Sequence, residues 1–166
     1  STITGMVIEA FEDMFWTLGN VGIMIIGSLP MLMDTGGNCG SQTSTLIIRG
    51  IALGHISFKD LVAVIYKELR VSFLVGLTLC AANIVRQLAL YYLVGEFSFI
   101  SFKVTMVVSC AVFLTVVLSK VIGCLLPLIA HRLNKDPALM SAPLITTIVD
   151  TLSVAILLAL SYVVLV

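Results

Sequence analysis

Charged side chains are scarce in this sequence. Only 11% of its 166 residues are Asp, Glu, Lys or Arg, and the nine acids balance the nine bases. A nucleic-acid-binding protein needs a basic face, so zero net charge argues against that class of partner. Hydrophobic residues make up 60% of the chain, and the mean hydropathy of +1.17 is far above that of ordinary soluble domains. The sequence therefore predicts an all-α integral membrane protein.

Paired cysteines are also missing. The four cysteines stand singly and form no C-x-x-C motif. Neither a disulfide scaffold nor a zinc site is indicated. We expect all four to be small residues packed in the protein interior: Cys39, Cys80, Cys110 and Cys124.

Apolar runs long enough to cross a bilayer recur along the whole chain. A hydrocarbon core about 30 Å thick needs roughly 20 apolar residues per helical pass. Membrane β-strands are disfavoured, because they show only about 10 residues of alternating polarity. One domain of five packed helices is predicted, the second of them kinked at Pro30, over residues 1–15, 18–53, 61–94, 102–130 and 137–166.

The first predicted helix is too short to cross the membrane. Fifteen residues span only about 22 Å of helix. The segment also lacks the basic region and the cleavage site of a signal peptide. We therefore expect a truncated first helix and a natural protein that continues upstream.

Basic residues predict the orientation in the plasma membrane. Six of the nine Lys and Arg flank two loops, which the positive-inside rule assigns to the cytoplasm: Arg49, Lys59, Lys67, Arg70, Arg132 and Lys135. The amino end is then inside and the carboxyl end outside.

An odd number of spans argues against an inverted repeat within one chain, so any symmetry must come from a second copy. Four acids fall toward the outer face, where they attract cations: Glu9, Glu12, Asp13 and Glu96.

The second predicted helix interrupts its apolar sequence with small and polar residues. The run from Asp34 to Gln42 reads DTGGNCGSQ. Two GxxxG pairs, Gly36 with Gly40 and Gly50 with Gly54, predict close approach of helix backbones. Packing does not account for the polar residues that recur every three or four positions in two adjoining lines, which are Asn38, Gln42, Thr45 and Arg49, and Asp34, Gly37 and Ser41.

A second acid, Asp150, stands alone in the apolar run 144–166. An uncompensated carboxylate at the membrane centre costs about 3 kcal/mol, so such an acid is expected to line a water-filled path or to meet a cation. Ala142, Thr146, Asp150 and Ser153 recur at helical spacing and form one face of small and hydroxylated residues. Oxygen ligands of this kind suit Mg²⁺, Ca²⁺ or Mn²⁺, and Mg²⁺ would be held through its water shell.

Lys120 offers a structural alternative for Asp150. An ion pair between the two would remove Asp150 from any path, although Asp34 or a snorkelling pose could also serve the lysine. Three further polar residues on the third helix predict an interhelical contact or an outer-leaflet anchor: Asn83, Arg86 and Gln87.

The polar segments also carry a combined signature. It consists of the run PMLMDTGGNCGSQTSTLIIRGIALG, which contains GGNxGxQ, and the later run LPLIAHRLNKDPALMSAPLITTIVD, which contains DPAL and PLxTTxxD. Together they resemble the membrane domain of the MgtE-type magnesium channels and transporters, over essentially the whole chain. The resemblance implies a homodimer of five-helix domains around a pore on the two-fold axis. It also implies gating by upstream cytosolic domains that sense Mg²⁺.

By motif position, the resemblance implies that Asp150 is the pore acid. Three positions depart from the family's pattern: Asp34 stands where a small residue is frequent, and Ser41 and Ala142 stand where Asn is common. Mg²⁺ is the implied cargo, with Mn²⁺ or Co²⁺ as further candidates. The residues expected to meet the hydrated ion are Asp34, Gly37, Asn38, Ser41, Ala142, Thr146 and Asp150.

Two other functions remain as alternatives. A Na⁺-coupled Mg²⁺ exchanger would differ in needing a Na⁺ gradient. The triplet Asp34-Thr35-Gly36 matches the DTG of aspartic proteases, and Asp34 could share a proton with Asp150 as a catalytic dyad. A second such triplet and the GxGD signature of intramembrane proteases are missing from the sequence. Transport, and not enzymatic catalysis, is therefore predicted.

Overall fold

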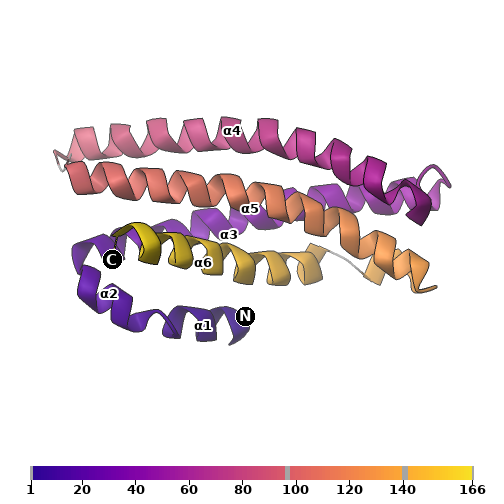
Figure 1. The fold of residues 1–166 in the computed structure, drawn as a ribbon, viewed down its shortest axis with the longest axis horizontal. Helices are drawn as coiled ribbons and strands as arrows, with labels where there is room; N and C mark the ends of the chain where they lie inside the picture. Colours follow the sequence, from indigo (N-terminus) through magenta and orange to yellow (C-terminus); the bar gives the residue numbers. More distant parts are fainter. Residues whose placement is uncertain (1, 96–97, 140–141, 166) are drawn as a thin grey trace.

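The computed structural model describes residues 2–95, 98–139 and 142–165. Throughout these ranges the regular structure is helical, and no strand occurs in them (Figure 1). In chain order the elements are α1 (Thr2–Glu9), α2 (Glu12–Leu18), α3 (Asn20–Ala52), the 3-10 turn η1 (Phe58–Asp60), α4 (Leu61–Val94), α5 (Phe99–Arg132), the 3-10 turn η2 (Pro137–Leu139) and α6 (Ala142–Leu165).

Four long helices run along the same axis, with α5 at the centre of the bundle. α5 packs extensively against α3, α4 and α6, and α3 also packs against α6. α4 lies along the outside of α5, and the short α1 and α2 fold back beside α6 (Figure 1). The α3–α6 contact matters most for function, because it joins the two segments that carry the predicted site residues.

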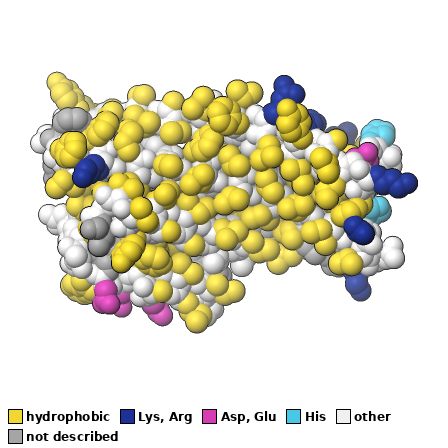
Figure 2. All heavy atoms as spheres, in the orientation of Figure 1, with side chains coloured by type: hydrophobic (Ala, Val, Ile, Leu, Met, Phe, Trp, Pro, Cys, Tyr) yellow, Lys and Arg dark blue, Asp and Glu magenta, His cyan; other side chains and the backbone are white. Residues whose placement is uncertain are grey.

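Both basic loops lie at the same end of the bundle. The turn between α3 and α4 and the turn between α5 and η2 meet there (Figure 1), and Lys, Arg and His side chains gather over that end in Figure 2. The Arg132 guanidinium stacks on the Phe58 ring at 4.2 Å and so links the two turns. The predicted clustering of these loops is confirmed, whereas their assignment to the cytoplasm stays a prediction.

The helix boundaries agree with the sequence in the middle of the chain and differ at its ends. α4 begins and ends at the predicted residues, and α3 and α5 differ from the predicted ranges by three residues or fewer. The prediction of one helix over residues 1–15 is wrong, because the helix is interrupted before Glu12 and a second helix begins there. Glu12 and Asp13 favour this new helix amino terminus, since their negative charges interact favourably with the helix dipole. The last helix starts at Ala142, since the segment from Pro137 forms its own 3-10 turn, held by a hydrogen bond of 2.9 Å from the Ala138 amide to Asp136.

In the described residues, three segments are long and apolar enough to span a membrane: Phe58–Val94, α5 and α6. α3 has 33 residues, about 50 Å of helix, but it carries the polar run from Asp34 to Arg49. It continues through Pro30 without a break, and the kink predicted there stays a prediction. Five spans per chain therefore remain a proposal.

Of the four acids predicted on the outer face, Glu9, Glu12 and Asp13 are exposed, and Glu96 lies outside the described residues.

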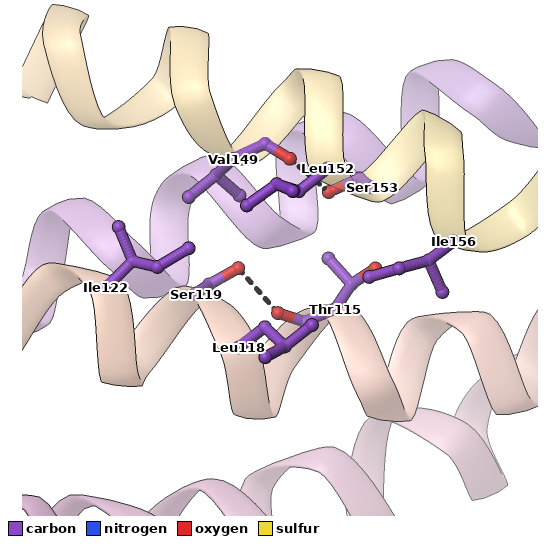
Figure 3. A pocket seen from close by; sticks show the side chains of 8 residues that line it. All are labelled: Thr115, Leu118, Ser119, Ile122, Val149, Leu152, Ser153 and Ile156. Carbon is purple, nitrogen blue, oxygen red and sulfur yellow. Dashed lines mark hydrogen bonds between the residues drawn. The ribbon is translucent and has the colours of Figure 1, made fainter.

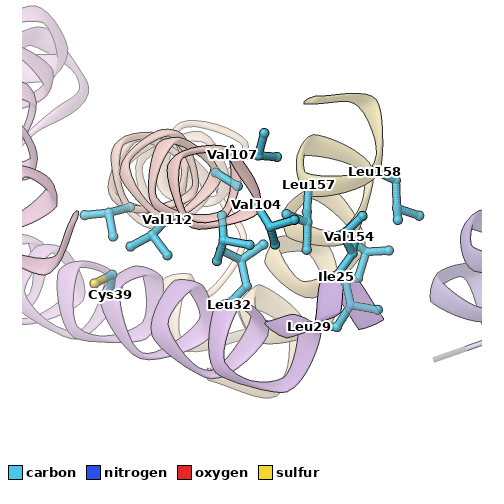
Figure 4. Packing of buried hydrophobic residues seen from close by; sticks show 13 residues of the cluster. Ile25, Leu29, Leu32, Cys39, Val104, Val107, Val112, Val154, Leu157 and Leu158 are labelled. Atoms are coloured by element: carbon cyan, nitrogen blue, oxygen red, sulfur yellow. The ribbon is translucent and has the colours of Figure 1, made fainter. Parts of the chain in front are cut away.

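The core is formed where α3, α5 and α6 meet (Figure 4). Its side chains are branched aliphatic residues that are at most 5% exposed, among them Ile25, Leu32, Val104, Val154 and Leu157. Cys39 and Cys124 are buried as predicted, but Cys110 is exposed, so not every cysteine belongs to the interior. Many large apolar side chains of α4 are exposed, as expected for a helix that faces lipid (Figure 2).

Glycine residues on α3 and α5 allow the backbones of the two helices to come into contact. A Cβ atom on Gly36 would lie 2.6 Å from Thr115 Cγ2 and 2.8 Å from Val149 Cγ1, and one on Gly123 would overlap the carbonyl oxygen of Gly40. The first GxxxG pair is therefore a packing motif, as predicted.

The second GxxxG pair does not pack two helices together. Gly54 lies beyond the end of α3, in a turn that requires its φ of +71°, and Gly50 faces Ile56 of the same turn. The prediction failed because the sequence spacing alone did not reveal that α3 ends at Ala52.

A buried ion pair ties α3, α4 and α5 together near the basic end. Lys120 Nζ of α5 lies 3.6 Å from Glu68 Oε2 of α4 and donates to Thr43 Oγ1 of α3 at 3.2 Å. Thr43 Oγ1 in turn donates to Glu68 Oε2 at 3.4 Å. Lys120 is 8% exposed and Glu68 6%. The proposed pairing of Lys120 with Asp150 or Asp34 is wrong, because Glu68 is its partner.

Removing one member of this pair should destabilise the fold more than removing both charges. Glu68→Gln or Lys120→Met alone leaves a buried charge uncompensated, which costs about 3–5 kcal/mol. We expect Glu68→Gln combined with Lys120→Met to regain most of that loss. Unfolding in detergent, followed by circular dichroism, measures the effect, with the exposed Lys67→Met as the control. Additive losses in the double variant would show that the pair is not coupled.

Glycine substitutions should separate packing from helix propensity. Gly123→Ala places a Cβ against the Gly40 backbone, which cannot rotate away, so we expect a loss of about 1–3 kcal/mol. Gly27→Ala on α3 meets no atom within 4 Å and should be neutral or gain up to about 1 kcal/mol. Thermal unfolding of the two variants tests this, and equal stabilities would contradict the close approach.

Candidate cation site

The seam between α3 and α6 brings three predicted site residues together. A Cβ atom built on Gly37 of α3 would lie 3.0 Å from Thr146 Cγ2 and 3.7 Å from Asp150 Oδ1 of α6. Gly37 is buried, whereas Thr146 and Asp150 are half-buried. The bare glycine therefore lets the Asp150 carboxylate approach the α3 backbone.

Asp150 is the one charged side chain of α6. Within the described parts of the chain, its carboxylate has no partner within ion-pair distance and accepts no hydrogen bond. Asp34 is exposed on α3 and close enough for the two carboxylates to interact electrostatically. Two neighbouring negative charges at an open seam form a place where a cation is stabilised.

The remaining α3 residues extend the polar surface toward the basic end. Asn38 is exposed one turn beyond Asp34. Ser41 is half-buried, and its Oγ is shielded from solvent and has no hydrogen-bond partner among the described residues. A shallow hollow of about 450 Å³ lies beside it, lined by Ser41, Gln42, Thr45 and Leu46. The amide and hydroxyl groups here are able to bind the water shell of an ion.

The two other predicted residues of α6 lie toward the basic end. Ala142 is exposed in the first turn, about 12 Å along the helix from Asp150. Thr146 donates its hydroxyl to the Pro143 carbonyl at 3.0 Å, so its oxygen can still accept a hydrogen bond from water. Of the three predicted α6 residues, Thr146 and Asp150 supply the atoms nearest to Gly37, whereas Ala142 is not among them.

Ser153 does not continue the polar face of α6. It is 1% exposed and donates to the Val149 carbonyl at 2.7 Å, in a space between α5 and α6 that also contains Thr115 and Ser119 (Figure 3). Ser119 likewise donates to the Thr115 carbonyl at 2.6 Å. The space is too narrow for a water molecule, so these hydroxyls serve packing. The predicted placement of Ser153 on a hydrated face is wrong.

The arrangement suits a hydrated divalent cation. Among the described residues, no group of three or more His, Cys, Asp or Glu converges. The donors at the seam are two carboxylates with neighbouring amide and hydroxyl oxygens. Mg²⁺ gives up water reluctantly and is usually bound through one or two carboxylates and its own waters. A protease dyad is not formed, because Asp34-Thr35-Gly36 lies within the continuous helix α3 and no hydrogen bond joins Asp34 to Asp150.

Two residues that position the seam escaped the sequence analysis. Glu68 stands beside Lys67, close to one of the basic loops, yet it is buried and pairs with Lys120. The signal available was Lys120 itself, since a buried ammonium group requires an acid within reach. Gly123 gave no signal, because it stands alone in α5 and only the approach of Gly40 gives it a role.

Comparison with known proteins agrees with the sequence signature. The family model described as "MgtE: Divalent cation transporter" matches residues 29–160. The magnesium transporter MgtE of Thermus thermophilus is 32% identical over 160 residues, which cover 96% of this chain and 33% of that protein. The magnesium transporter MgtE of Bacillus subtilis is 32% identical over 154 residues, which cover 93% of this chain and 32% of that protein.

The chain spans about a third of the length of these curated relatives. The family match includes α4, α5, the α3–α6 seam and the buried ion pair. Both relatives are named as transporters and not as enzymes. On this evidence the chain belongs to the MgtE family of divalent cation transporters.

Proposed function

We propose that this chain is the ion-conducting domain of a magnesium transporter and that hydrated Mg²⁺ crosses the membrane along the α3–α6 seam. The observation that carries the proposal is the position of Asp150. Its carboxylate lies on an otherwise uncharged helix, half-exposed beside Gly37, and none of the described residues forms an ion pair with it. A charge in this position is costly unless it meets a cation.

A second copy of the chain completes the path in this proposal. Asp34 and Asn38 are exposed on one side of the seam, so a single chain offers half of a lining. Two-fold pairing through α3 and α6 encloses the path and brings two Asp150 carboxylates near the axis. Each chain contributes five spans, with α1 and α2 as the first, and the basic end lies in the cytoplasm. The amino end is then inside and the carboxyl end outside.

Each site residue has a distinct role in this path. Asp150 supplies the charge that offsets the cost of bringing a divalent cation into a low-dielectric environment. Water molecules of the ion bind to Asn38, Ser41 and Thr146, and Gly37 and Ala142 leave room for the hydrated ion. Mn²⁺ and Co²⁺ are further candidates for cargo, because ions with similar hydration fit the same lining.

Neutralising Asp150 should abolish most ion flux. Asp150→Asn keeps the shape and one oxygen but removes the charge, so we expect Mg²⁺ uptake into liposomes to fall at least about tenfold. Asp136→Asn, an exposed acid in the loop before α6, is the matched control and should leave uptake unchanged. Light scattering should show a dimer for all three proteins.

Wild-type uptake by a properly folded Asp150→Asn dimer would refute the proposed path. Uptake that requires a Na⁺ gradient would instead identify a coupled exchanger. A monomer that carried the full flux would refute the two-fold arrangement.

Asp34 should modulate the path and not create it. It is exposed and lies beyond the Gly37 contact with Asp150, so Asp34→Asn should lower uptake by less than about tenfold and weaken the competition by Mn²⁺ and Co²⁺. Uptake of Mg²⁺ with each competitor, compared with the exposed Glu9→Gln, measures both effects. Complete loss of uptake in a folded Asp34→Asn dimer would give Asp34 the same importance as Asp150.

A further inference from the structure

A crevice opens on the lipid-facing side of the bundle, away from the α3–α6 seam. It lies between α3, α4 and α5 and has a volume of about 220 Å³. Three of its lining residues are polar, namely Thr35, Asn83 and Arg86. The rest of the lining is apolar and includes Met31, Leu79 and Val112.

Buried groups hold the Arg86 guanidinium at this crevice. Its Nη2 donates to Asn83 Oδ1 at 3.0 Å and weakly to Met31 Sδ at 3.3 Å. Asn83 is only 5% exposed, and its amide donates to Ser109 of α5 at 2.9 Å. The guanidinium is therefore oriented by a network that reaches α5. Of its five N–H donors, those on Nε and Nη1 have no partner among the described residues.

The charge of Arg86 has no counter-ion in the described part of the chain. The one ion pair found there joins Lys120 to Glu68. Arginine stays protonated in proteins, so the charge cannot be removed by loss of a proton. Arg86 is exposed, so an anion from outside the chain can approach and stabilise this charge.

The depth of Arg86 identifies where that anion lies. We place one membrane boundary at Lys67 and Arg70 of α4, because both are exposed cations at the basic end of the bundle. Arg86 is about 24 Å farther along the helix. Because the hydrocarbon core is about 30 Å thick, Arg86 is near the opposite boundary, at the level of lipid headgroups.

We propose that this crevice binds an anionic phospholipid from the leaflet opposite the basic end, with Arg86 holding the phosphate. The planar guanidinium presents paired N–H donors that match two phosphate oxygens. Leu79 lies about two turns from Arg86 toward the membrane centre, where an acyl chain would run from a headgroup at Arg86. A free phosphate ion would gain nothing from this apolar lining. The proposal does not depend on which ion the protein transports.

Bound lipid would join α3 to α4, which otherwise packs mainly on α5. Thr35 and Met31 of α3 line the crevice together with Arg86 of α4. Thr35 is adjacent to Asp34 in the sequence, so the lipid would contact the helix that carries the polar side of the seam.

Native mass spectrometry of the detergent-purified protein tests the proposal. Phosphatidylglycerol and, separately, phosphatidylcholine are titrated onto wild type, Arg86→Gln, Arg86→Lys and Lys103→Gln. Lys103 is the matched control, because it is an exposed cation at the same end of the bundle and its ammonium stacks on Phe99. We expect wild type to retain one phosphatidylglycerol per chain in preference to phosphatidylcholine.

The variants should separate a specific site from general surface charge. Arg86→Gln should weaken phosphatidylglycerol retention about tenfold, since a hydrogen-bonded charge is lost. Arg86→Lys should keep part of it, and Lys103→Gln should match wild type. Circular dichroism checks that each variant is folded. The loss of phosphatidylglycerol retention in Arg86→Gln is then compared with the retention by folded Arg86→Lys.

Four results would overturn the proposal. The first is wild-type retention of phosphatidylglycerol by Arg86→Gln. The second is an equal loss in Lys103→Gln, which would indicate general surface charge. The third is displacement of the lipid by millimolar inorganic phosphate, which would indicate a free-anion site. Absence of lipid from wild type, with a change of oligomeric state in Arg86→Gln, would assign the crevice to a second copy of the chain and also refute it.

Discussion

The close approach of the α3 backbone to α5 and α6 is the constraint on which the rest of the structure depends. Gly36 and Gly40 allow α3 to lie in the groove between the two other helices, and Gly123 removes the remaining side chain from the contact. This approach sets Gly37 against Asp150. A side chain at any of these glycines would move α3 outward and open the seam. The geometry of the candidate site therefore depends on the lack of a side chain at these positions.

α3 separates its polar groups into two kinds. Thr43 points into the bundle and is satisfied by Lys120 and Glu68. Asp34 and Asn38 are exposed, and the Ser41 hydroxyl has no partner. Buried polar groups in proteins are nearly always hydrogen-bonded, so the unpartnered Ser41 hydroxyl beside an open hollow marks a surface at which water or a ligand is expected. The hydroxyls of Thr115 and Ser161 also lack a partner among the described residues, but both lie in the packed interior, so it is the position beside the seam that distinguishes the α3 residues.

The sequence predicted the class of protein, the four long helices and the family, because these depend on hydropathy and on local motifs. The range 61–94 was correct at both ends, since Asp60 precedes the helix and Gly95 ends it in a left-handed conformation. The Glu68–Lys120 pair was missed because its partners are on different helices, and periodicity gives the face of a helix but not its neighbour. Ser153 was misplaced for the same reason: hydroxyl groups on one face of α6 bond to their own backbone against α5.

Asp150 was identified from the sequence because an isolated acid in an apolar run is costly wherever it lies. Its contact with Gly37 could not be predicted, since that contact depends on how α3 lies between α5 and α6. Arg86 was recognised as a polar group on the third predicted helix, but the crevice beside it depends on three helices at once. For both residues, the charge and its apolar surroundings could be recognised from one segment of sequence. The contacts with other helices could not be predicted from it.

The buried pair on α4 and α5 has an electrical consequence for the seam. Because Glu68 compensates Lys120 within a few ångströms, the two produce little field at a distance. Of the described charged side chains, Asp34 and Asp150 lie at the α3–α6 seam, and each contributes a negative potential there. Such a contribution extends over roughly one Debye length, about 8 Å at physiological ionic strength. Over that distance the two carboxylates attract cations and repel anions before any ion makes contact with the protein.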